Sequence, residues 1–232
     1  MTNVVTDDKI VHDQHAQPRS ERIDVSDLRQ GVPLPPQPRA WFVAAPVLMF
    51  GYGVVRLIDG RDGEYGPGWS WTIGHLLFLA GMLLFGGVFV RLRRLVPATT
   101  MAQKVTAYAA MVLGLAGIGA FVQVLVLDLV VGFRADNNAE MSEVRDDIGD
   151  ILLPEAVWDL GPLLFQAGLN VLAVQLAALR PRRLAAWSPA LIVIGFACIM
   201  VNLNLLSIGA ALFGLALAPW AWRYAGNSLG RQ

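Results

Sequence analysis

A chain of 232 residues with 55% hydrophobic and only 16% charged residues is too apolar for a water-exposed globular protein. Its 18 basic and 18 acidic side chains give a formal net charge of zero, but they fall in different segments of the chain. This composition predicts an all-α, polytopic transmembrane helical bundle, with six spans expected and five as the alternative.

Residues 1–39 are polar, and we expect them to form a disordered cytoplasmic tail with a Pro-rich end. The segment mixes acidic and basic residues and has no apolar middle region of the kind that a secretory signal needs. The first span therefore has to direct insertion into the membrane.

Long apolar stretches follow this tail, and a hydrocarbon core of roughly 30 Å takes about 20 helical residues to cross. We expect the first four spans at about 40–55, 70–90, 105–130 and 158–179. The last stretch, 187–222, is 36 residues without a charge, and one straight helix of that length would reach about 54 Å. It is therefore predicted to fold as a hairpin of two short spans, 187–202 and 205–222, that turns at Asn202–Asn204.

The orientation follows from the basic residues, because cytoplasmic segments retain positive charge. Fourteen basic side chains fall on the side of the N-terminal tail, the second and fourth loops and the C-terminal tail 223–232. Only four fall on the other side, and these are Arg56, Arg61, Arg134 and Arg145. Both termini are therefore predicted to be cytoplasmic, whereas a five-span chain would place the C-terminus outside.

The loop 134–157 is strongly acidic and is predicted to be external. Apolar residues recur in it at spacings of three and four, which predicts a short helix with one apolar stripe, lying on the outer surface or over the bundle. The stripe consists of Met141, Val144, Ile148, Ile151 and Leu152. Asn138 is the expected N-cap. The carboxylates lack the spacing of an EF-hand loop, so no calcium site is expected.

Polar side chains are costly inside lipid and are therefore the default candidates for function. We expect an outward-facing polar cavity formed by His75, Gln123, Asp128, Asp159, Gln166, Asn170, Asn202 and Asn204. Asp159, Gln166 and Asn170 lie within about 40° on one helical face. They would either line a vestibule or, in the favoured interpretation, bond to neighbouring helices.

Asp128 lies near the outer end of the third span, and its role depends on whether it is buried. A buried Asp128 needs a partner, and His75 is at comparable depth, so the two would form a proton relay or an acid/base site. The favoured alternative places His75 at the interface, between Trp69, Trp71 and the lipid headgroups.

Several enzyme classes are excluded by missing motifs. No span contains a lysine, which excludes a retinal Schiff base, and one membrane histidine cannot give a bis-histidine haem. The chain also lacks a phosphate-binding glycine loop, a zinc-binding helix and a nucleophile elbow. We therefore expect no catalytic residue, no bound metal and no cofactor.

The leading hypothesis is a non-enzymatic membrane component, sensor or accessory subunit in a bacterial cell membrane. The alternatives are a small-molecule or ion transporter, and an intramembrane enzyme acting on a lipid or isoprenoid in which His75, Asp128 and Asp159 converge. The expected partners are the lipid bilayer and a lipidic or small-molecule ligand, with no nucleic acid. Arginine outnumbers lysine 16 to 2, which is typical of GC-rich bacterial genomes.

Overall fold

The computed structural model describes residues 38–62, 65–152, 155–179 and 186–229, and within these ranges every regular element is a helix. The predicted tail 1–39 lies outside the described residues except for its last two, which begin the first helix. In chain order the elements are α1 (Pro38–Asp59), η2 (Gly60–Asp62), α2 (Trp69–Leu95), α3 (Met101–Arg134), α4 (Asn138–Leu152), α5 (Glu155–Leu179), α6 (Ser188–Val201), η3 (Leu203–Leu205) and α7 (Leu206–Leu229).

Four of these helices are long and apolar enough to cross a membrane, which agrees with the predicted all-α membrane bundle. The four segments are Ala40–Asp59, Trp69–Leu95, Met101–Arg134 and Asp159–Leu179. The first three extend past the predicted apolar cores because polar residues continue and cap the helices, whereas the fourth agrees with its predicted span to within one residue. At the start of α3, for example, Thr100 and Gln103 form a capping box. With 34 residues, α3 is about 51 Å long and extends beyond a bilayer core of roughly 30 Å.

The charge-free stretch is two helices, as predicted, and not one long helix. The helical hydrogen bonding stops at Asn202, whose backbone is extended with φ −159°, and the Asn202 side chain accepts a hydrogen bond from the Asn204 amide at 2.8 Å. After this turn α7 packs back along α6. The helix α7 continues to Leu229, past the predicted end at residue 222.

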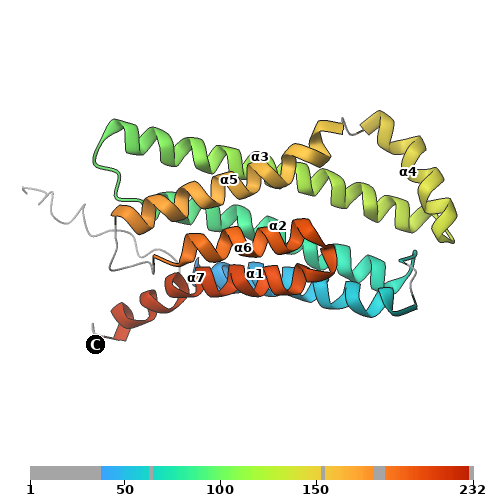
Figure 1. Cartoon of the computed structure of the whole chain (residues 1–232), viewed down its shortest axis with the longest axis horizontal. Coiled ribbons are helices and arrows are strands. Elements are labelled where there is room, and N and C mark those ends of the chain that lie inside the picture. Colours follow the sequence, from blue (N-terminus) through green and yellow to red (C-terminus); the bar gives the residue numbers. More distant parts are fainter. Residues whose placement is uncertain (1–37, 63–64, 153–154, 180–185, 230–232) are drawn as a thin grey trace, which may run out of the picture. The chain divides into compact units, whose positions relative to one another are not determined.

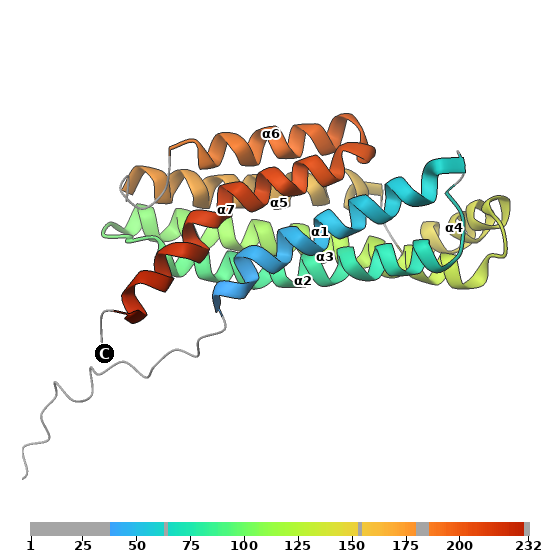
Figure 2. The same cartoon turned by 90° about the horizontal axis from the view of Figure 1, so that it is seen from below.

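The helices of residues 38–229 pack side by side (Figures 1 and 2), with α3 against α5 and α1 against both α2 and α7. Phe165 of α5 lies at the centre of the core. Its ring makes edge contacts with Phe85 at 5.3 Å and Phe89 at 5.6 Å from α2, and with Phe121 at 5.9 Å from α3. These contacts tie the three helices together in one apolar cluster.

The acidic segment forms the predicted helix, α4, which folds back on the last turns of α3 (Figure 1). Met141, Val144 and Ile148 of its stripe pack against α3, whereas the side chains of Ile151 and Leu152 lie outside the described residues.

The predicted N-cap of α4 is wrong by one residue. The Asn137 side chain, not that of Asn138, accepts a hydrogen bond from the Glu140 amide, at 3.0 Å. Glu140 in turn accepts one from the Asp136 amide at 2.7 Å. Asn137 is the N-cap because its side-chain oxygen lies three residues before the backbone amide that donates to it, which is the usual spacing for an N-cap.

Candidate functional site

Three ionisable side chains from three helices meet where α4 covers the end of α3. Asp128 of α3 lies between His75 of α2 and Arg145 of α4. Arg145 Nη2 donates to Asp128 Oδ1 at 2.6 Å, and His75 Nε2 lies 3.5 Å from Asp128 Oδ2. The side chains of His75 and Asp128 are 5% and 12% exposed, whereas that of Arg145 is 41% exposed. The cluster is therefore a buried acid–histidine pair closed from outside by a half-exposed arginine.

Trp71, which lies one helical turn before His75 on α2, holds His75 and Asp128 in position. Its indole nitrogen donates to the backbone oxygen of Asp128 at 3.0 Å, and its own backbone oxygen lies 2.8 Å from His75 Nδ1. Because a carbonyl can only accept, Nδ1 carries the proton and donates it. Nε2, which faces the carboxylate, then carries a proton only when His75 is an imidazolium. The sequence had favoured an interfacial His75 among lipid headgroups, and this interpretation is wrong because the side chain is buried between Trp71 and Tyr52.

A small polar cavity lies on the other side of His75. It is lined by residues of α1, of the loop between α1 and α2, and of α2. Its volume is about 10 Å³, enough for roughly one water molecule. Arg56 lies over the Tyr65 ring at 4.2 Å, and Ser70 donates a hydrogen bond to Asp59. Two further charged side chains, Arg56 and Asp59, thus line the same cavity as the buried His75.

Helical spacing explains how α1 supplies its share of this cavity. Tyr52, Arg56 and Asp59 are four and three residues apart, so they lie on one face of the helix. Tyr52 makes an edge contact with the His75 ring at 5.5 Å and stacks on Phe78 at 4.8 Å. Tyr52 therefore stands between the polar cavity and the apolar interior of the bundle.

Of the eight side chains predicted for the outward-facing cavity, the structure brings His75 and Asp128 together. Asn204 is linked to the same region because it accepts a hydrogen bond from the Tyr65 hydroxyl at 3.0 Å, and Tyr65 lines the polar cavity. Asn202 is exposed, and its side chain closes the hairpin turn.

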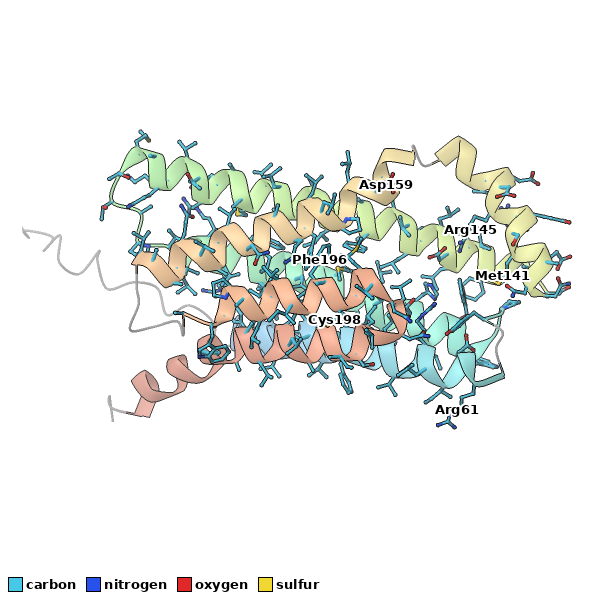
Figure 3. The ribbon with its side chains drawn as sticks, viewed as in Figure 1. Arg61, Met141, Arg145, Asp159, Phe196 and Cys198 are labelled. Atoms are coloured by element: carbon cyan, nitrogen blue, oxygen red, sulfur yellow. The ribbon has the colours of Figure 1, made fainter. Side chains whose placement is uncertain are left out.

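The other four predicted side chains lie elsewhere on α3 and α5. Gln166 is buried, and its side chain donates to the backbone oxygen of Ile192 at 3.3 Å, which joins α5 to α6. Asn170 is half-buried on the same helix, one turn after Gln166. Gln123 and Asp159 are exposed, and Figure 3 shows Asp159 near the start of α5. The intramembrane-enzyme hypothesis required Asp159 to converge with His75 and Asp128, but Asp159 lies on the exposed surface of α5.

The most important residue that sequence reasoning missed is Arg145. It had been counted only as one of the external arginines, yet it lies four residues after Met141 and three before Ile148, on the apolar face of α4. Figure 3 shows Met141 and Arg145 together on this helix. A lone cation on the buried face of an acidic helix is the signal that could have identified it.

Within the described ranges, no group of three or more His, Cys, Asp or Glu side chains is arranged to hold a metal ion. Comparison of the sequence with protein-family models, with curated proteins and with solved structures finds no match. The arrangement of the side chains is therefore the basis for any statement about function.

Proposed function

We propose that this chain is a six-span membrane protein with both termini cytoplasmic, and that it acts without catalysis, as a sensor or accessory subunit, through its external helix α4. The observation that carries the proposal is the hydrogen bond from Arg145 to the buried carboxylate of Asp128. It couples the position of an external helix to the interior of the bundle. A partner or stimulus that moves α4 would leave Asp128 without its strongest donor.

The position of Asp128 along α3 supports this orientation. It lies 24 residues after Lys104, or about 36 Å of helix, just beyond a hydrocarbon core of roughly 30 Å. At this depth the Asp128 carboxylate lies at the outer boundary of the membrane, where α4 rather than lipid covers it. The concentration of Lys and Arg in the segments at the opposite ends of the spans agrees with the positive-inside rule.

Reporter fusions test the topology. A fluorescent protein fused after Gln232 is expected to fluoresce, and alkaline phosphatase at the same place is expected to be inactive, because both would be cytoplasmic. Phosphatase fused after Asp136 is the matched control and is expected to be active outside. An active phosphatase after Gln232 would contradict the six-span arrangement.

A deletion strain complemented with variants tests the role. For a sensor or accessory subunit, complementation is expected to follow the docking of α4, so that Arg145→Lys retains function and Arg145→Gln, which weakens the docking, reduces it. Neither variant is expected to change the level of a single product in the lipid and metabolite profile. Accumulation of a single substrate in the deletion strain, reproduced by a His75→Gln variant that keeps α4 docked, would overturn the proposal.

That opposite outcome corresponds to the second candidate function, an intramembrane acid/base enzyme. The contact between His75 and Asp128, beside a cavity with room for about one water molecule, favours it specifically. It ranks second because Asp159, which this hypothesis needed as a third group, lies on the exposed surface of α5.

A further inference from the structure

A second cavity, of about 250 Å³, lies in the interior of the bundle and is lined entirely by apolar residues. Six helical elements besides η3 contribute to its wall, so it is a feature of the whole bundle and not of one helix pair. Phenylalanine rings form much of the lining, among them Phe121, Phe165, Phe196 and Phe213. Figure 3 shows Phe196 on α6.

The chemistry of the lining decides what can occupy this space. A buried water molecule needs two to four polar partners, and none of the lining side chains supplies one, so the cavity excludes water. An apolar cavity of about 150 Å³ is already large enough to bind benzene. This cavity is larger, and an apolar occupant would regain the van der Waals contacts that an empty space loses.

The cavity opens where α6 ends. Met200 and Leu203 both line it, and they are 57% and 47% exposed, whereas Met82, Phe165 and Phe213 in its depth are at most 2% exposed. The opening follows from the hairpin turn, because the helix stops at Asn202 and no longer covers the interior there. An apolar rim on the surface of a membrane bundle faces lipid chains, so an occupant can enter sideways from the bilayer.

The blind end of the cavity adjoins the candidate site. Phe78 lines the apolar cavity and stacks on Tyr52, and Tyr52 lines the polar cavity beside His75. The two cavities are thus separated by one pair of stacked rings. An occupant of the apolar cavity would press on this pair and through it on the position of His75.

We propose that the apolar cavity binds one hydrocarbon chain of a membrane lipid, which enters between Met200 and Leu203 and lies against the phenylalanine rings. The inference needs only that the bundle is embedded in a bilayer, and it does not rest on the role proposed for α4. The chain can be the acyl chain of a phospholipid or the prenyl chain of an isoprenoid lipid, since both present the same apolar surface.

Photolabelling of the purified full-length chain in lipid nanodiscs tests this proposal. One arm uses a phospholipid with a diazirine at the end of an acyl chain, and the other uses a prenyl phosphate with a diazirine at the end of its chain. Saturable labelling of Met82, Phe121 or Phe165 is expected in at least one arm, and the arm that gives it identifies the source of the chain. Labelling in both arms that is confined to lipid-facing side chains such as Val112 and Leu215 would overturn the proposal.

A variant at the opening gives a second test. Met200→Trp is expected to reduce interior labelling about tenfold because the indole fills the entrance. Ile208→Trp is the matched control, since Ile208 is similarly exposed, at 52%, but does not line the cavity. Undiminished labelling in Met200→Trp would contradict entry at this point, and the labelling pattern of the unmodified chain remains decisive if that variant fails to fold.

Discussion

Replacing Arg145 with glutamine is expected to weaken the docking of α4 by about 2 kcal/mol and to speed hydrogen exchange in α4 about thirtyfold. Arg145 donates at 2.6 Å to a carboxylate whose side chain is only 12% exposed. Without it, Asp128 keeps the more distant contact with His75, at 3.5 Å. The cost is therefore the burial of a carboxylate that has lost its strongest hydrogen bond.

The expected size is below the 3–5 kcal/mol or so that follows when one partner of a fully buried ion pair is removed. Arg145 is 41% exposed, so water screens the pair and solvates the guanidinium in part. The apolar contacts of Met141, Val144 and Ile148 with α3 are unaffected by the change. The helix α4 is thus expected to open more often while it remains helical and mostly in place.

Hydrogen–deuterium exchange of peptides that cover residues 138–148 measures this effect. Arg134→Gln is the matched control, because it makes the same chemical change at an exposed arginine at the end of α3. A double-mutant cycle with Asp128→Asn assigns the effect to the pair, since Arg145→Gln is expected to add little once Asp128 is neutral. Equal exchange in Arg145→Gln and Arg134→Gln would mean that the ion pair does not hold α4.

The sequence predicted most of the fold because the cost of exposing backbone groups in lipid leaves helices as the simplest solution for long apolar runs. The break near Asn202 was predictable from length alone, since one helix over 187–222 would be far longer than the bilayer core. The N-cap at Asn137 was missed because the sequence prediction placed the cap at Asn138, although both residue types are good caps. The sequence signal was Glu140, which follows Asn137 by three residues, the spacing of a capping box, and accepts from the Asp136 amide in the structure.

The candidate site was predictable in part. The depth of a residue in the membrane can be counted from the loop boundaries, but the direction in which its side chain points from the helix cannot. His75 and Asp128 were identified because they are costly side chains at one depth. The direction of Gln123 was not accessible, because α3 is apolar on all sides and its buried face leaves no periodic signal. Arg56 and Asp59 were missed because the first span was expected to end at residue 55, whereas α1 continues to Asp59.

The second large effect is expected from Gly168 of α5, where the backbones of α5 and α3 approach each other closely. A Cβ atom added at Gly168 would lie 2.5 Å from the Ala110 oxygen and 2.6 Å from the Gly114 nitrogen. Both are backbone atoms of α3, which cannot rotate away as a side chain can. Small residues in such positions allow helix backbones to touch, and these contacts replace the hydrophobic effect that lipid cannot supply.

Gly168→Val is therefore expected to destabilise the bundle by about 3 kcal/mol, at the upper end of what overpacking costs in a well-packed core. Gly168→Ala should cost less but still be measurable, because its single methyl group already overlaps the α3 backbone. Unfolding of the purified chain by increasing SDS in mixed micelles, followed by circular dichroism, gives the free energies.

Gly119→Val is the matched control on α3, since a Cβ atom at Gly119 meets nothing within 4 Å. It is expected to change stability by less than about 0.5 kcal/mol, because it adds a methyl-bearing side chain on an open face. The substitution at Gly168 also affects the candidate site, because α3 carries Asp128. A larger side chain between α5 and α3 has to shift α3 toward either α2 or α4. If Gly168→Val and Gly119→Val unfold at the same SDS concentration, then the close backbone contact between α3 and α5 at Gly168 does not stabilise the bundle.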